Sequence, residues 1–170
     1  MKPIPADLRI EGGRALATWG PAGWGPAIQR GKYRHGAFSD ELVAALGRLV
    51  GRWQPQPGPG WVAWVPSHRH PDLVASFAQR LAVWLDLPAV DSLCLTRAAD
   101  AQKGKENSAQ QFANVHGAFA VRGGGVPAAP VLLVDDMVDS RWTMTVVGAV
   151  LREAGSGPVF PLALAVTTSG

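Results

Sequence analysis

The chain has 170 residues, about the size of one compact domain. With 47% apolar and only 17% charged residues, the composition excludes an intrinsically disordered chain. The single cysteine, Cys94, excludes an internal disulfide framework and a multi-thiolate zinc site. No apolar run reaches the length of about 18 residues that a membrane helix needs, and the N-terminus lacks the apolar stretch of a signal peptide. We therefore expect a cytoplasmic protein with no membrane partner.

The net charge of +3 is unevenly distributed. Residues 1–52 carry eight basic and four acidic residues, a net charge of +4, which leaves −1 for residues 53–170. A basic N-terminal third of this kind is compatible with nucleic acid or another anion as a partner. The alternative is an ordinary solvated surface, because the excess charge is small and spread out.

The first 37 residues show no regular period, and we expect their tryptophans to pack on the main domain. Ser39-Asp40-Glu41 resembles a helix start, with a capping hydroxyl followed by acids, and apolar residues continue at helical spacing to Trp53. The Pro- and Gly-rich stretch 54–60 cannot be helix or central strand. We therefore predict a basic, Trp-rich extension with one helix over residues 1–55 and a main domain over 56–170.

The main domain alternates predicted strands with predicted helices. The strands are short apolar runs at 61–65, 92–95, 118–121, 131–134 and 159–166. Helical patterns cover 71–85, 108–115 and 142–154, and the polar stretch 98–110 is predicted as an exposed loop. Strands that are apolar throughout and alternate with helices predict an α/β fold, a mainly parallel sheet with helices on both faces.

In such a sheet, ligands bind beyond the carboxyl ends of the strands. Asp135 and Asp136 directly follow the aliphatic run 131–134 and precede a predicted helix start. Adjacent carboxylates at a strand end are costly unless hydroxyls, a cation or backbone amides use them, and a helix N-terminus favours an anion. This combination suits a sugar phosphate. The alternative is that both aspartates only cap the turn and the helix.

The stretch Val131–Thr143 resembles the signature of type I phosphoribosyltransferases, which is four apolar residues, two acids, two variable residues and Thr-Thr-Gly-x-Thr. Thr96-Arg97, then 107–111 and 114–119, is similar to the ComF-like branch of that family. The segments 106–111, 135–143 and 155–159 are most similar to the C-terminal phosphoribosyltransferase-like module of bacterial RecQ-type DNA helicases. Three upstream segments add to this likeness: Gly13–Ala17, Gly23–Gly25 and Gly31–Tyr33. The helicase ATPase motif Gly-Lys-Ser/Thr is absent from this sequence.

The resemblance implies a role for each matching position. Asp135 and Asp136 would be the catalytic acids, meeting the ribose hydroxyls of phosphoribosyl diphosphate (PRPP) and, through that ligand, Mg²⁺. The 5′-phosphate would be wrapped by Asp139, Ser140, Arg141, Trp142 and Thr143. The diphosphate with its Mg²⁺ would be held by Ser67, His68 and Arg69. A flexible cover over the site would include Arg97 and Gln111.

The chain departs from the family pattern in the phosphate loop, where Thr-Thr-Gly-x-Thr is replaced by Asp139-Ser140-Arg141-Trp142-Thr143. Asp139 places a negative charge where a phosphate dianion is expected, and Arg141 replaces the glycine that lets the backbone approach it. We therefore predict an accessory domain of a RecQ-type helicase that binds a phosphate-containing ligand without transferring ribose. Its partners would be the helicase motor and nucleic acid, the latter through residues 1–52. The alternative is an active, Mg²⁺-dependent phosphoribosyltransferase that uses PRPP and an unknown acceptor.

Overall fold

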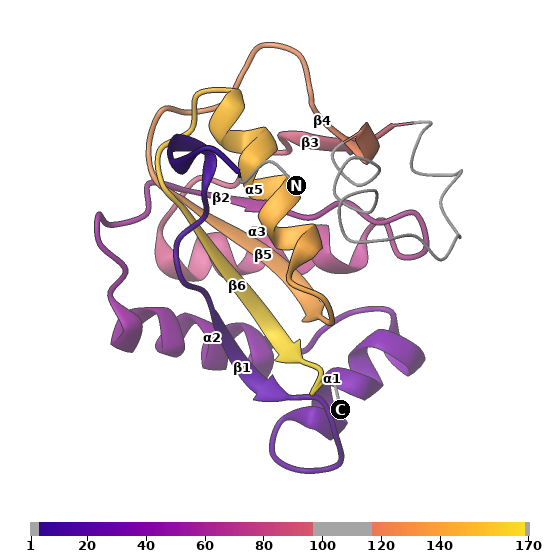
Figure 1. Ribbon diagram of the computed structural model, residues 1–170. Coiled ribbons are helices and arrows are strands. Elements are labelled where there is room, and N and C mark those ends of the chain that lie inside the picture. The colour runs from indigo at the N-terminus through magenta and orange to yellow at the C-terminus, as the bar shows by residue number, and fades with distance from the viewer. Residues whose placement is uncertain (1–3, 97–116, 169–170) are drawn as a thin grey trace.

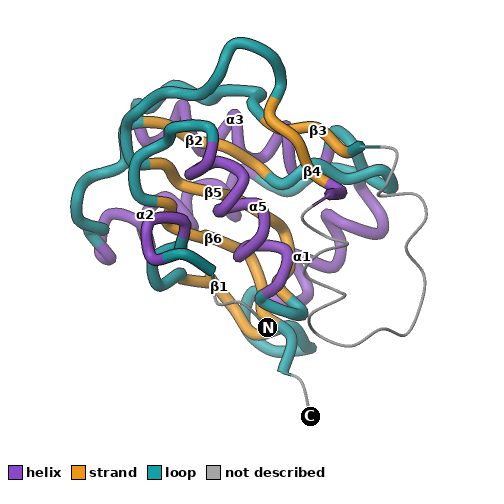
Figure 2. Tube along the Cα trace, turned by 45° about the horizontal axis from the view of Figure 1, so that its top comes forward, coloured by secondary structure: helices purple, strands orange, loops and turns teal. Residues whose placement is uncertain are grey.

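A parallel sheet forms the centre of the computed structural model, which describes residues 4–96 and 117–168 (Figure 1). Within these residues the sheet has four strands, and Figure 2 shows them side by side: β1 (Arg14–Thr18), β6 (Val159–Val166), β5 (Val131–Val138) and β2 (Trp61–Trp64). Every neighbouring pair in this order is parallel. The predicted α/β fold with a parallel sheet is confirmed.

Helices cover both faces of the sheet, as the continuous apolar strands predict. One face packs against three helices: α1 (Gly25–Arg30), α2 (Asp40–Trp53) and α3 (Leu73–Leu85). The other face packs against α5 (Trp142–Glu153), which lies in front of the strands in Figure 2. Alternation along β5 divides its side chains between the two layers, since Leu132 and Val134 point to the first and Val131 and Leu133 to the second.

The predicted helix boundaries follow the capping residues. Ser39 caps α2, because its Oγ accepts a hydrogen bond from the backbone N–H of Leu42 at 3.4 Å. The helix ends at Trp53 and is followed by Gln54 in the left-handed conformation. At the end of α5, Gly155 has φ +102°, a conformation that glycine adopts without strain. The sequence predicted β6 with the observed bounds and α5 to within one residue.

The N-terminal segment is more regular than predicted. It contains short helical turns at η1 (Ala6–Leu8) and η2 (Gly31–His35), and β1 forms the edge of the main sheet by pairing with β6. Residues 14–18 therefore belong to the sheet rather than to an irregular cover. The proposed domain boundary at residues 55 and 56 stays a prediction.

Two predicted strands do not join the main sheet. β3 (Leu93–Leu95) and β4 (Phe119–Val121) pair with each other as a separate antiparallel ribbon beside α5. The outer edge of β2 is instead met by residues 88–90 through a single bridge, Val62 with Ala89. Pro88 has no N–H, so this pairing cannot extend to the N-terminal side of the bridge.

The predicted loop 98–110 and the predicted helix 108–115 lie outside the described residues. Across the ranges 4–96 and 117–168, no helix combines the length and the apolar character needed to cross a membrane.

Candidate functional site

A cleft of about 530 Å³ lies at the carboxyl ends of β2 and β5. Its walls come from segments far apart in the sequence: the turn after β2, the end of β5, the first turn of α5, and η2 of the N-terminal segment. The ribbon adds apolar residues such as Leu95 and Phe119. This is the edge of a parallel sheet at which ligands of α/β proteins bind.

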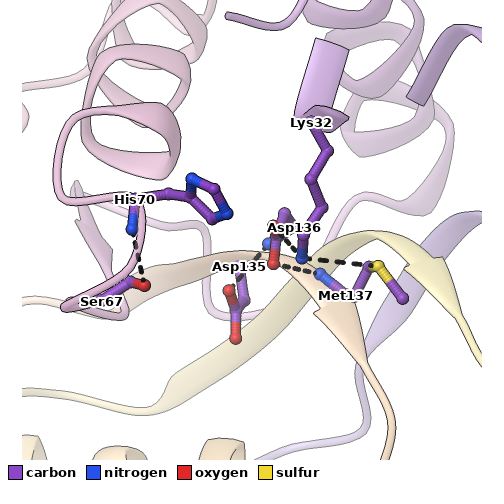
Figure 3. A network of polar contacts seen from close by, with 6 residues as sticks. All are labelled: Lys32, Ser67, His70, Asp135, Asp136 and Met137. Carbon is purple, nitrogen blue, oxygen red and sulfur yellow. Dashed lines mark hydrogen bonds and ion pairs between the residues drawn. The ribbon is translucent and has the colours of Figure 1, made fainter. Parts of the chain in front are cut away.

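Six of the predicted site residues line this one cleft: Ser67, His68, Arg69, Asp135, Asp136 and Thr143. The turn after β2 is fixed locally, because the backbone N–H of His70 donates to the Ser67 Oγ at 3.3 Å (Figure 3). Strand topology brings residues about 70 positions apart in the chain into this cleft, since β2 and β5 are neighbours in the sheet.

The two aspartates lie within β5, whereas the sequence predicted them after the strand. The strand continues beyond Val134 because β6 keeps pairing with it, Asp135 lying opposite Ala163 and Met137 opposite Ala165. Consecutive strand residues point to opposite sides. Accordingly, Figure 3 shows the Asp136 carboxylate directed toward η2 and the Asp135 carboxylate directed away from it. Both side chains nevertheless border the cleft, since the strand end is open.

Each aspartate accepts a hydrogen bond from the next backbone amide. The N–H of Asp136 donates to Asp135 Oδ1 at 2.8 Å, and the N–H of Met137 donates to Asp136 Oδ1 at 2.7 Å. Burial raises the pKa of Asp135 well above the usual aspartate value, and the negative charge of Asp136 raises it further. Asp135 therefore takes up a proton at higher pH than an exposed aspartate does.

Lys32 is a site residue that the sequence reasoning missed. Its Nζ donates to Asp136 Oδ2 at 2.8 Å and lies 3.6 Å from Met137 Sδ. Figure 3 shows its side chain reaching down from η2 to the acid pair. The two residues are 104 positions apart, so spacing gave no indication of the contact. The only sequence signal is the short segment Gly31-Lys32-Tyr33, whose likeness to the family does not by itself place Lys32 in the site.

Most of the predicted phosphate loop lies away from the cleft. Asp139 Oδ1 accepts a hydrogen bond from the Thr167 hydroxyl at 2.6 Å, which ties it to the end of β6. Arg141 lines a different cavity of about 540 Å³, beside the start of β1. Ser140 is exposed, and Trp142 is half-buried and does not line the cleft. Thr143 is thus the member of this loop that lines the cleft, while Arg97 and Gln111 lie outside the described residues.

The donor set of the cleft does not fit an Mg²⁺ ion held directly by the acid pair. Both oxygens of Asp136 already accept hydrogen bonds, one of them from the ammonium group of Lys32. A cation at 2.8 Å from this carboxylate repels a second cation at the same place. In the described part of the chain, no three His, Cys, Asp or Glu residues are grouped as metal ligands would be.

No model of a known protein family matches the chain, and a search of curated proteins finds no match. Solved structures do match. The purine phosphoribosyltransferase from Pyrococcus horikoshii is 18% identical over 76% of this chain and 76% of its own, with a TM-score of 0.48. The allosteric regulatory enzyme of purine biosynthesis is 22% identical, with a TM-score of 0.50. That match covers 72% of this chain and 25% of the enzyme.

A third match is the adenine phosphoribosyltransferase from Leishmania tarentolae, 17% identical over 76% of this chain and 72% of its own, with a TM-score of 0.46. At such identities, similarity concerns the fold and not the activity. The parallel sheet with acids at the end of β5, together with the match at a TM-score of 0.50, gives the chain the α/β fold of type I phosphoribosyltransferases.

Proposed function

We propose that this protein is a phosphoribosyltransferase-like module that binds a phosphate-containing ligand, a nucleotide or sugar phosphate, without transferring ribose. The observation that carries the proposal is the meeting of acids, hydroxyls and cations in one cleft. Asp135 and Asp136 offer acceptors to sugar hydroxyls, whereas Lys32 offers N–H donors and Thr143 a hydroxyl to a phosphate. Carboxylates for the sugar and donors for the phosphate are what a sugar phosphate requires.

Two features support binding without transfer. Transfer of ribose from PRPP depends on holding the 5′-phosphate in position as well as on stabilising the charge of the departing diphosphate. In the loop 139–143, which would hold the ligand's 5′-phosphate, Asp139 is hydrogen-bonded to Thr167 and Arg141 lines a separate cavity. Most of this loop therefore does not face the cleft. In addition, Asp136 is already paired with Lys32. The cleft retains the recognition groups for a phosphorylated sugar and lacks the family's full phosphate cradle.

The proposal is tested by calorimetric titration with PRPP and with ribose 5-phosphate, alongside an assay for diphosphate release in the presence of purine and pyrimidine bases. We expect binding that Thr143→Ala weakens and no release of diphosphate. Thr145→Ala is the matched control, because Thr145 lies on the same helix and lines the other cavity. The proposal would be contradicted if neither PRPP nor ribose 5-phosphate binds.

The proposal includes an accessory role beside the motor of a RecQ-type DNA helicase in the cytoplasm. Its support is the sequence likeness of segments 106–111, 135–143 and 155–159, together with a basic N-terminal third. Phosphate groups of a nucleic acid bind basic side chains, and the arginines of that third are exposed: Arg9, Arg14, Arg30, Arg34, Arg48 and Arg52.

Fluorescence anisotropy with labelled single-stranded and duplex DNA tests this part of the proposal. Binding should weaken steeply as salt rises, because each phosphate contact releases a counterion. Replacing Arg30 and Arg34 together by Gln should weaken binding and reduce the salt dependence. Absence of binding at low salt would refute a nucleic-acid role and leave the small-molecule site untouched.

A second candidate is an active phosphoribosyltransferase that takes PRPP, with magnesium carried by the diphosphate, and an unidentified acceptor. One observation favours it, namely that Asp135, Asp136 and Ser67 all line the same cleft as Thr143. Diphosphate release that requires Mg²⁺ and is lost in Asp136→Asn would establish this function in place of the first.

A further inference from the structure

Lys32 reaches the acid pair from a part of the chain outside the sheet. It belongs to η2, the helical turn that follows α1, and its side chain extends from that turn to Asp136 (Figure 3). Only 17% of the Lys32 side chain and 13% of the Asp136 side chain are exposed. An ion pair this sheltered is ordered and little screened by salt, unlike a pair on the open surface.

Each carboxylate oxygen of Asp136 already accepts one hydrogen bond from the protein itself. Its Oδ1 accepts from the backbone N–H of Met137 at 2.7 Å, and its Oδ2 accepts from Lys32 at 2.8 Å. An ammonium group has three donors. Besides the bond to Asp136, Lys32 makes a weak contact with Met137 Sδ at 3.6 Å. Because Lys32 also lines the cleft, its remaining N–H can meet a ligand there.

The charge that Lys32 brings alters what the cleft attracts. Adjacent carboxylates repel a phosphorylated sugar, and a divalent cation carried with the ligand would relieve that repulsion. Here a fixed ammonium group neutralises Asp136 within the protein itself. The turn on the facing wall adds the basic side chains of Arg69 and His70 to the same cleft. The cleft is therefore suited to an anion without help from a metal.

We propose that Lys32 is a built-in counter-ion of the acid pair, so that this cleft binds sugar-phosphate anions without a divalent cation. The inference rests on the proposed function, since it concerns the same ligand class and the same cleft. In this arrangement the sugar hydroxyls donate to the carboxylates, and Lys32 donates to an oxygen of the phosphorylated ligand. Lys32 is thus a specificity-determining residue that selects a metal-free anion.

The test is calorimetric titration of the full chain with ribose 5-phosphate, once in EDTA and once in excess Mg²⁺. For the wild-type protein we expect dissociation constants that agree within about twofold in the two buffers. Lys32→Met should weaken binding in EDTA by about tenfold or more, and added Mg²⁺ should restore part of the loss. Lys32→Arg should bind nearly as the wild type does, which separates loss of charge from loss of folding.

Arg122→Met is the matched control, because it removes one positive charge at an exposed position that does not line the cleft. Its affinity should stay within about twofold of the wild-type value. Wild-type binding that needs Mg²⁺, or Lys32→Met binding at wild-type strength in EDTA, overturns the inference and leaves the proposed function standing. No binding of ribose 5-phosphate in either buffer overturns the inference, and if PRPP does not bind either, the proposed function is overturned as well.

Discussion

The ion pair between Lys32 and Asp136 should stabilise the fold as well as shape the cleft, and a double-mutant cycle measures by how much. At 2.8 Å, two unit charges attract by about 6 kcal/mol at an effective dielectric of ~20 and by about 1.5 kcal/mol in bulk water. Partial burial costs both groups hydration, which offsets much of the attraction. We therefore expect a coupling free energy of about 1–3 kcal/mol between Lys32→Met and Asp136→Asn.

The assay is urea denaturation of the wild type, the two single variants and the double variant, with the free energy of unfolding compared across the four. The exposed pair of Arg122 and Asp91 provides the control cycle. Its side chains are 56% and 59% exposed and its charged atoms are 3.3 Å apart, so its coupling should be about 0.2–1 kcal/mol. A coupling between Lys32 and Asp136 no larger than in this control would refute the view of a sheltered, ordered pair.

Three further predictions concern the fold. Since burial raises the pKa of Asp135, the folded state holds its proton to higher pH than the unfolded state does, and stability should fall as pH rises from the ordinary aspartate range through the raised pKa. Asp135→Asn should flatten that decline and raise Tm at neutral pH by roughly 2–4 °C for each kcal/mol gained, as thermal melts across pH can show. Trp61→Phe removes the buried bond from the indole N–H to the Ala129 carbonyl at 2.9 Å and should cost about 1–3 kcal/mol in urea denaturation. Gly157→Ala would place a Cβ 2.7 Å from the Ala129 carbonyl carbon and should lower Tm. Gly51→Ala, in open space on α2, should instead raise the free energy of unfolding by about 0.5–1 kcal/mol.

The parts of the fold that the sequence predicts well are those with strong local signals. The aliphatic run 131–134 is typical of a buried strand, and Ser39 with its following acids is typical of a helix start. The edge strand β1 has no such signal. Its residues 14–18 are exposed or half-buried, and it forms because β6, buried along most of its length, needs a partner on its second edge.

The same distinction explains the site. Acids at the end of an apolar strand indicate the carboxyl edge of a sheet, where ligands bind. The place of Asp135 and Asp136 in the site could therefore be predicted from local sequence. The turn at 67–69 could be predicted in the same way. Lys32 could not, because its role depends on how η2 folds over the end of β5, a contact between segments more than 100 residues apart. The direction taken by the loop after β5 was also beyond local sequence, since Asp139 is held by Thr167 from another strand.

We expect a phosphorylated sugar to occupy the cleft at the ends of β2 and β5. A crystal structure of the protein grown with ribose 5-phosphate tests this expectation. It should show ribose hydroxyls on the carboxylates of Asp135 and Asp136, with Lys32 within hydrogen-bond distance of a ligand oxygen. Ligand density in the cavity beside Arg141, with the cleft at Asp136 empty, would contradict it.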